Sequence, residues 1–482
     1  MHRPTAASRA PSRRRWLGFT AAAALLAGAA IAAEGCWLAG STRPVSCIWI
    51  VVDTLRADHL EWYGYGRPTA PELRPLVERG VLFEHAYTSL PETTPAMSSM
   101  LTSMYPYRHG VQHLFQRLND RNVTAPELLK KAGYATGAFV SSFVMIRNFS
   151  NFARGFDVYD DFVDEREKYR DNYERKAART LDRARTWIEA HRAAPFFCFI
   201  HLIDPHGPYT PPGKFALRFH SATTEPIAKS LIPSYQQMPG VTDANRYRDL
   251  YDGEIAYASS ELGRFFAYLE SADLLAPNLV VFAADHGEAM GEHGFYFQHG
   301  SDIYEQEVHV PLIVKPPAGM RAARGTRVAQ TVSVVDILPT VLETLGLPSL
   351  AVFQGRSLVP LLVGDAGDAG GVFARRPVFF ELNGHIRQVG EVRAGRKLLL
   401  AGDQLAEYDL GRDPAERIPL PPERRDLAAE SELKAWKTMS ELWHRDFVVE
   451  TNGMAEALRG AFVHGRRDPD ESARHLRSLG YL

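Results

Sequence analysis

The sequence predicts an α/β fold in which a mostly parallel sheet is sandwiched by helices. Short apolar runs with the character of strands buried on both faces recur at 47–52, 81–87, 135–142, 195–200 and 278–284. Helical patterns lie between these runs. Acidic side chains follow two of them directly, at Asp53 and Asp285. Because ligand sites in open α/β sheets gather at the carboxyl ends of strands, we expect a functional site there.

Composition limits the classes of function. The chain has 482 residues, of which 45% are apolar and 23% charged, so it can bury a large core and form more than one structural unit. Its formal charge of −2 comes without a basic stripe, which excludes a nucleic-acid partner. Cys47 and Cys198 lie in predicted strands as buried small side chains, and no disulfide framework is indicated.

An export segment is predicted at 1–36. Three arginines at 13–15 precede an Ala/Leu-rich apolar run at 16–33, and 12–17 also has the pattern of a twin-arginine signal. Two alternatives stay open: a retained membrane anchor, and lipidation of Cys36. All three place the body of the protein outside the cytoplasm, in the periplasm, outside the cell, or anchored to the membrane and facing outward.

The remaining elements complete the predicted organisation. Helices are expected at 70–80, 124–133, 165–192, 246–275 and 331–345, short strands at 377–381 and 397–401, and a flexible linker at 364–371. The helix at 165–192 is highly charged, and solvation alone explains its charges. We therefore expect a catalytic domain at 45–365 and a smaller α+β C-terminal subdomain at 372–482.

The stretch 91–111, PETTPAMSSMLTSMYPYRHGV, predicts a nucleophile at the start of a helix. Thr93 stands just before a short helical pattern with Pro95 in its first turn. Unpaired backbone N–H groups and the helix dipole attract phosphate or sulfate at such a place. The alternative is that Thr93 or Thr94 only caps the helix.

This stretch resembles the nucleophile segment of the sulfatases, within the alkaline phosphatase superfamily. Sulfatases carry Cys or Ser in the position of Thr93, which is converted to formylglycine, and an arginine in the position of Met97. Threonine in that position resembles the lipoteichoic acid synthases and phosphoethanolamine transferases of the same superfamily.

Further segments resemble the family, so that the resemblance covers about 48–482. They are V-V-D-T-L-R-A-D-H-L from Val51, D-P-H-G-P-Y from Asp204, D-H-G from Asp285, V-P-L-I-V from Val310 and E-Y-D-L from Glu407. The resemblance implies an alkaline-phosphatase-like sheet sandwiched by helices. It also implies one metal ligand fewer than in many sulfatases, because Thr54 stands where they carry a second acid.

The resemblance implies one divalent metal ion, held by Asp53, Thr93, Asp285 and His286. These mixed oxygen and nitrogen ligands suit Zn²⁺ or Mn²⁺, and Ca²⁺ and Mg²⁺ also stay open. His206 and His299 are the further catalytic candidates, contacting substrate oxygens or protonating the leaving group.

In the same segment as His206, His201 and Asp204 are expected only to hold the loop.

The function expected is that of an exported, metal-dependent hydrolase or transferase of phosphate or sulfate esters, with Thr93 as metal-activated nucleophile. Phosphoesters are favoured because threonine cannot yield the aldehyde of formylglycine. The substrate is a small-molecule, glycan or lipid ester. Two alternatives remain: a sulfatase working without formylglycine, and a non-catalytic binding protein on the same fold.

Overall fold

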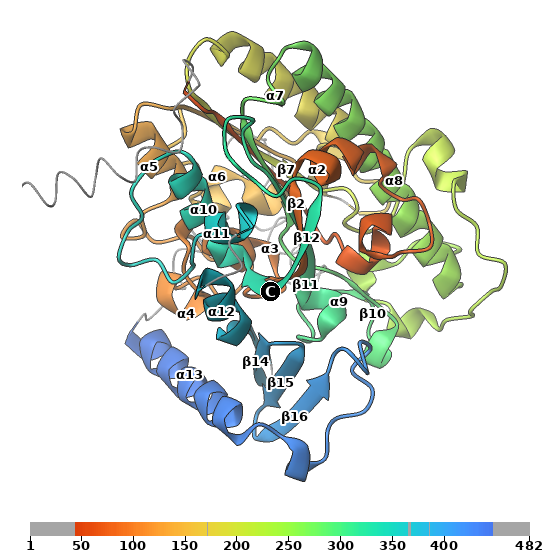
Figure 1. The fold of residues 1–482 in the computed structure, drawn as a ribbon. Coiled ribbons are helices and arrows are strands. Elements are labelled where there is room, and N and C mark those ends of the chain that lie inside the picture. The colour runs from red at the N-terminus through yellow and green to blue at the C-terminus, as the bar shows by residue number, and fades with distance from the viewer. Residues whose placement is uncertain (1–43, 171, 365–367, 385, 447–482) are drawn as a thin grey trace, which may run out of the picture.

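The computed structural model describes residues 44–446, apart from 171, 365–367 and 385. Within these residues a central mixed sheet of eight strands is flanked by helices, and a smaller antiparallel sheet follows near the C-terminus (Figure 1). The predicted α/β class is therefore confirmed. The predicted export segment, Cys36 and the last part of the C-terminal subdomain lie outside the described residues.

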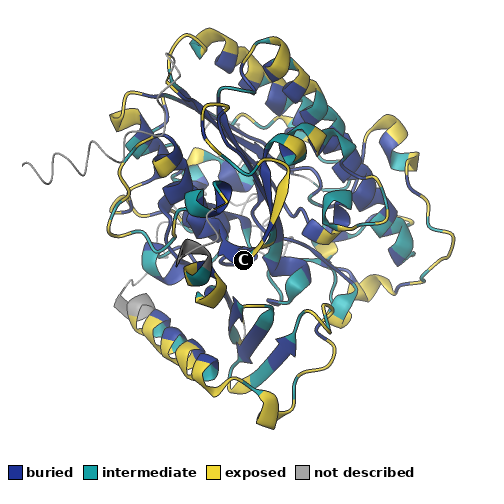
Figure 2. Cartoon of the chain, viewed as in Figure 1, coloured by how far each residue is buried: buried dark blue, intermediate teal, exposed yellow. Residues whose placement is uncertain are grey.

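The central sheet has the order β12-β2-β11-β8-β1-β7-β3-β4. Its strands are β1 Cys47–Val52, β2 Val81–Tyr87, β3 Ala135–Val140, β4 Val158–Asp160, β7 Phe196–Leu202, β8 Leu279–Ala284, β11 His309–Lys315 and β12 Thr326–Ser333. Only β11 runs antiparallel to its neighbours within this sheet. Every residue of β1, β7 and β8 is buried. The central strands are accordingly mostly dark blue in Figure 2. Continuous apolar runs form such strands because both faces of the sheet are covered.

Helices pack on both faces of this sheet (Figure 1). The α-helices are α2 Arg74–Arg79, α3 Thr93–Thr102, α4 Pro106–His109, α5 Ala125–Lys131, α6 Arg147–Ser150, α7 Ala177–His191, α8 Ala244–Ser271, α9 Glu305–Val308, α10 Ile337–Thr344, α11 Val359–Leu362 and α12 Asp368–Arg375. Helix α7 lies against β3 and β7 and is itself covered by α8, whereas α10 packs against β8 and α3. No helix among the described residues is long and apolar enough to cross a membrane.

The structure corrects several predicted elements. The helix expected at 165–192 begins only at Ala177, and the residues before it form the short hairpin strands β5 Glu165–Arg166 and β6 Tyr173–Glu174. The segment 331–345 starts as the end of β12 before it becomes α10. The expected linker at 364–371 runs into helix α12 at Asp368.

The C-terminal sheet is built from β13 Val378–Asn383, β14 Arg387–Arg393, β15 Arg396–Ala401 and β16 Gln404–Asp409, with α13 Leu427–Asp446 beside it. Buried Lys397 of β15 joins this sheet to the rest of the molecule. Its Nζ lies 3.0 Å from Glu305 Oε1 at the start of α9 and 3.0 Å from Glu416 Oε1. The boundary drawn between the two predicted domains stays a prediction.

Candidate active site

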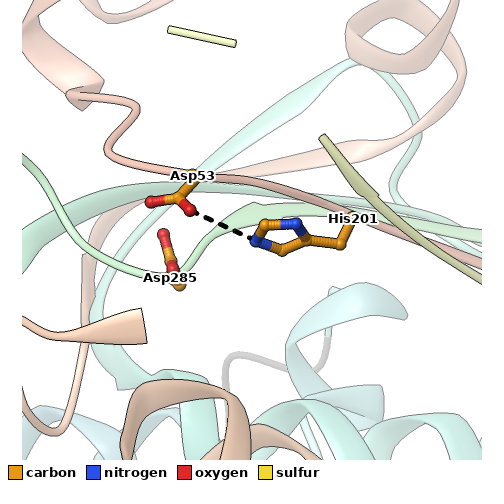
Figure 3. A group of neighbouring side chains, drawn as sticks. All are labelled: Asp53, His201 and Asp285. Carbon is orange, nitrogen blue, oxygen red and sulfur yellow. Dashed lines mark ion pairs between the residues drawn. The ribbon is translucent and has the colours of Figure 1, made fainter. Parts of the chain in front are cut away.

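Three buried side chains meet at the carboxyl edge of the central sheet: Asp53 directly after β1, Asp285 directly after β8, and His201 near the end of β7 (Figure 3). They meet because β1 pairs with both β7 and β8. His201 Nε2 lies 3.5 Å from Asp53 Oδ2. One ligand atom from each of the three residues lies within 4.8 Å of the other two.

His286 and Thr93 approach the same group. His286 Nε2 lies 3.7 Å from Asp53 Oδ1, 3.6 Å from Asp285 Oδ2 and 3.4 Å from Thr93 Oγ1. The other ring nitrogen, Nδ1, lies 2.9 Å from the carbonyl oxygen of Gly287. Because a carbonyl only accepts hydrogen bonds, Nδ1 carries the proton and Nε2 presents its lone pair to the group.

The donor atoms of this group fit a divalent metal ion. Within the described part of the chain, both carboxylate oxygens of Asp53, Oδ2 of Asp285 and both ring nitrogens of His201 are buried without a hydrogen-bond partner. Burial raises the pKa of Asp53 to about 6. Burial, and then the neighbouring charge of Asp53, raise the pKa of Asp285 well above its ordinary value. A bound cation would supply the missing partner and favour the charged carboxylates.

A pocket opens onto this group and is lined by Asp53, Thr93, Leu114, Ser142, Phe143, Val144, Glu167, Arg170, Asn172, Tyr173, Glu174, Ile203, His206 and His299. One part of its wall is apolar. Another part is polar and comes from the hairpin that precedes α7. The rings of His206 and His299 stand edge to face, with their centroids 5.1 Å apart.

The two pocket histidines differ in their surroundings. Burial lowers the pKa of His299, but the carboxylate of Glu288, together with those of Asp53 and Asp285, more than offsets this, so the pKa of His299 lies above its usual value. Glu288 is fully buried, and its Oε1 lies 3.2 Å from His299 Nδ1. His206 Nδ1 instead donates to the carbonyl of Gly207 at 2.7 Å, and burial holds the pKa of His206 well below its usual value.

Comparison with protein-family models gives two matches. The model described as Sulfatase matches residues 46–347, well over half of the chain. The model described as N-sulphoglucosamine sulphohydrolase, C-terminal, matches residues 291–420. The chain belongs to the sulfatase family.

Curated relatives are sulfatases. Arylsulfatase K of Gallus gallus is 26% identical over 388 residues, covering 71% of this chain and 71% of that protein. Arylsulfatase K of Homo sapiens is 26% identical over 328 residues, covering 59% of this chain and 60% of that protein. A putative extracellular sulfatase Sulf-1 homolog of Caenorhabditis elegans is 27% identical over 331 residues, which are 59% of this chain and 45% of that protein. The chain thus spans less than two thirds of the latter two relatives.

Solved structures of sulfatase-like enzymes share the fold. One, determined with its substrate D-glucosamine-2-N,6-O-disulfate, has a TM-score of 0.67 at 19% identity and covers 85% of this chain and 100% of its own. The phosphonate monoester hydrolase of Agrobacterium radiobacter has a TM-score of 0.65 at 19% identity, covering 83% and 96%. The alkaline-phosphatase-like fold is confirmed. As a sulfatase-family member, the protein is an ester hydrolase of the alkaline phosphatase superfamily.

Within this sulfatase-family site, the structure brings together the four predicted metal ligands and places His206 and His299 on the same pocket. Their chemical roles stay predictions. The capping alternative for Thr93 finds no support, because α3 begins at Thr93 itself and Glu92 occupies the cap position, without a side-chain capping bond. The hydroxyl of Thr94 is buried without a partner among the described residues.

Sequence reasoning missed several site residues. His201 was expected only to hold a loop, yet it lies between strands β1 and β3 and points at Asp53 (Figure 3). Glu288 follows D-H-G directly, and this adjacency was the available signal. The hairpin at 165–174 lines the pocket but lies in the charged segment 165–192, which we expected to be one helix. The available signal was the weak apolar periodicity of its first ten residues, which does not favour a helix there.

Proposed function

We propose that this sulfatase-family protein is a metal-dependent phosphoester hydrolase or phosphotransferase in which unmodified Thr93 is the nucleophile. The observation that carries this proposal is the position of Thr93 Oγ1. It lies 3.4 Å from His286 Nε2, beside the two buried carboxylates, and lines the pocket. Threonine has a methyl group on Cβ and cannot become the aldehyde that formylglycine formation makes from Cys or Ser.

The proposed metal ligands are Asp53, Asp285, His286 and Thr93. A divalent ion bound there would lower the pKa of the Thr93 hydroxyl and would offset negative charge on the transferred group. The start of α3 adds unpaired backbone N–H groups, which favour an anionic substrate group at this place.

In the first half of the reaction, Thr93 loses its proton to solvent and Oγ1 attacks phosphorus. The bond between phosphorus and the leaving oxygen breaks, and His299 gives that oxygen a proton through Nε2. His299 is suited to this role by position, since it lines the pocket and its Nδ1 lies against Glu288. His206 contacts the oxygens of the transferred group from the same pocket.

In the second half, water attacks the phosphothreonine and passes its proton to His299, and Thr93 leaves as the alkoxide and takes back a proton from solvent. The products are the alcohol and phosphate, and His299 is again protonated. If an acceptor alcohol takes the place of water, the same steps give a transferase.

A second candidate function is sulfate-ester hydrolysis without formylglycine. The arylsulfatase relatives and the structural neighbour solved with a glucosamine disulfate favour it. The phosphonate monoester hydrolase neighbour favours phosphorus chemistry. We favour phosphorus chemistry because of Thr93. A sulfate ester on threonine lacks the route by which an aldehyde hydrate eliminates sulfate.

The same comparisons and the N-terminal sequence support a proposed substrate class and location. Neighbours act on glycosaminoglycan or small-molecule esters, so the proposed substrate is a small-molecule, glycan or lipid ester. We place the body of the protein outside the cytoplasm, because three arginines precede an apolar run at 16–33 and two relatives are described as extracellular. A C-terminal reporter tests this location, and replacing Arg13 and Arg14 by Lys tests the twin-arginine route.

The test of function is a panel of aryl phosphate, phosphodiester, phosphonate and sulfate esters with Mn²⁺, Zn²⁺ or Ca²⁺ added. We expect phosphorus esters to be turned over better than sulfate esters. Thr93→Val should lose at least about 100-fold in kcat/KM. Thr94→Val is the matched control, since it removes the adjacent buried hydroxyl, and it should stay within a few-fold of the wild type. Preference for sulfate esters would contradict the reaction class.

A further inference from the structure

No hydrogen bond within the described part of the chain accounts for an imidazole at His201. It is completely buried, and neither of its ring nitrogens has a hydrogen-bond partner among residues 44–446 as described. An unpaired buried polar group destabilises the folded protein, so a histidine here needs a compensating partner. The only charged group that an ion-pair distance connects to it within the described residues is Asp53.

The register of the sheet directs His201 at the proposed metal ligands. His201 pairs with Val51 of β1, two residues before Asp53. Since side chains two apart on a strand point to the same face, His201 and Asp53 share one face of the sheet. Figure 3 shows the ring of His201 turned toward the carboxylate of Asp53, with Asp285 beside both.

Three separations between donor atoms are close to those of ligands around one metal ion. Bonds of about 2.1 Å in a tetrahedral arrangement place neighbouring ligand atoms about 3.4 Å apart. His201 Nε2 lies 3.5 Å from Asp53 Oδ2. His286 Nε2 lies 3.7 Å and 3.6 Å from oxygens of Asp53 and Asp285. These distances are longer than hydrogen bonds and fit a shared ion.

Thr54 follows Asp53 directly and adds no carboxylate to the group. Its backbone is instead engaged: Thr54 N–H donates to Asp285 Oδ1 at 3.2 Å, and its carbonyl accepts from the Tyr251 hydroxyl at 2.7 Å. The donor atoms that lie within 4.8 Å of one another come from two carboxylates and the His201 imidazole, and His286 adds a second imidazole 3.6–3.7 Å from oxygens of the same two carboxylates. Ca²⁺ takes six to eight oxygen ligands, whereas imidazole suits transition metals.

We infer that His201 is a direct ligand of the proposed metal ion, and that this second imidazole makes the site select a transition metal such as Zn²⁺ or Mn²⁺ over Ca²⁺. The inference rests on the proposed metal-dependent function and adds a ligand and a metal preference to it.

Pulsed electron paramagnetic resonance on the Mn²⁺-loaded full-length protein counts the coordinated nitrogens. We expect couplings from two imidazoles in the wild type, and from one in His201→Gln and in His286→Gln. His206→Gln is the matched control, since it changes a histidine of the same pocket outside the donor group, and two couplings should remain. The wild-type count stands even where a variant fails to fold.

Equilibrium dialysis against Zn²⁺, Mn²⁺ and Ca²⁺ tests the metal preference. His201→Gln should weaken binding of Zn²⁺ and Mn²⁺ by more than the roughly 10–100-fold loss typical of an outer hydrogen-bonding residue. Binding of Ca²⁺ should fall much less.

A single nitrogen coupling in the wild type, or equal losses for all three metals in His201→Gln, would overturn the inference while leaving the metal site intact. Absence of stoichiometric metal from the wild type under every condition would overturn the metal-dependent function together with it.

Discussion

Among the histidines of the site, His206, His286 and His299 each have one ring nitrogen engaged by a single neighbouring acceptor. Nδ1 of His286 donates to the carbonyl of Gly287, and Nδ1 of His206 donates to that of Gly207. Nδ1 of His299 lies against Glu288. Each ring therefore has Nε2 left for a metal ion or a substrate. Two backbone carbonyls and one buried carboxylate thus determine which ring nitrogen of these three histidines is available for binding.

Removal of either buried carboxylate should empty the metal site. Asp285→Asn and Asp53→Asn each delete a charged ligand, so metal content and activity should fall together. Elemental analysis of the purified variants checks the content, and esterase assays check the activity. Asp182→Asn is the control, because Asp182 is exposed, with 59% of its side chain accessible, and should change neither. Full metal occupancy in both site variants would contradict the assigned ligands.

At the scale of elements, helix α3 is joined to α4 by buried polar contacts. The Ser99 hydroxyl of α3 lies 2.9 Å from His109 Nε2 of α4, and His109 Nδ1 accepts from the backbone N–H of Val111 at 3.1 Å. Nε2 therefore carries the proton and donates to Ser99. These contacts hold the helix that begins with the proposed nucleophile.

His109 should make the protein lose stability in mild acid. Burial lowers the pKa of His109 from 6.5 to about 3. The unfolded chain therefore binds a proton at this site below pH 6.5 that the folded protein does not bind. The neutral, buried His109 therefore does not lower the free energy of unfolding above pH 6.5. This free energy then falls progressively as the pH decreases from 6.5 to about 3. At pH 5 it amounts to a loss of about 2 kcal/mol relative to pH 7.5.

Urea denaturation of the wild type and of His109→Asn at the two pH values measures this contribution. The asparagine does not titrate, so the wild type should lose about 2 kcal/mol more than the variant between pH 7.5 and pH 5. Other titrating groups are common to both proteins and cancel in the difference. Parallel losses would show that His109 is not responsible.

Among the elements, the sequence predicted those whose residues carry a strong local signal. Strands β1, β7 and β8 are continuous apolar runs, so their position was predictable. The hairpin of β5 and β6 has two-residue strands in a charged segment and gives no such signal.

The site was predictable as far as residues follow strand ends or known motifs. His201 could not be assigned, because its contact with Asp53 arises from the pairing of β1 with β7, which are far apart in the chain.

At the scale of the whole molecule, a buried ion pair joins the C-terminal sheet to a helix beside the active site. Lys397 is completely buried and pairs with Glu305, which begins α9, and with Glu416. Two residues beyond Glu305, the Glu307 carboxylate accepts from Gly300 N–H at 2.8 Å, next to His299. The Glu307 carbonyl accepts from Gly287 N–H at 2.8 Å, next to His286. The attachment of this sheet is thus connected through α9 to both histidines.

Lys397→Met should therefore destabilise the protein and lower its activity. Removing one partner of a buried ion pair costs about 3–5 kcal/mol, because the remaining charges are left unpaired. Lys434→Met is the control, since its pair with Glu430 is exposed and contributes at most about 1 kcal/mol. Thermal denaturation measures the stability of the two variants, and esterase assays measure their activity. A triple variant that also carries Glu305→Gln and Glu416→Gln should recover stability, and failure to do so would contradict the electrostatic explanation.

The most direct measurement is to find the atom that carries the transferred group. The enzyme is mixed with a ³²P-labelled aryl phosphate, quenched in acid within the first turnover, digested and mapped by mass spectrometry. The account predicts label on Thr93 in the wild type and none in Thr93→Val, with the peptide mass showing an unmodified threonine in unlabelled chains. Label on Thr94, Ser98 or Ser99, or full turnover by Thr93→Val, would contradict the assignment of Thr93 as the nucleophile.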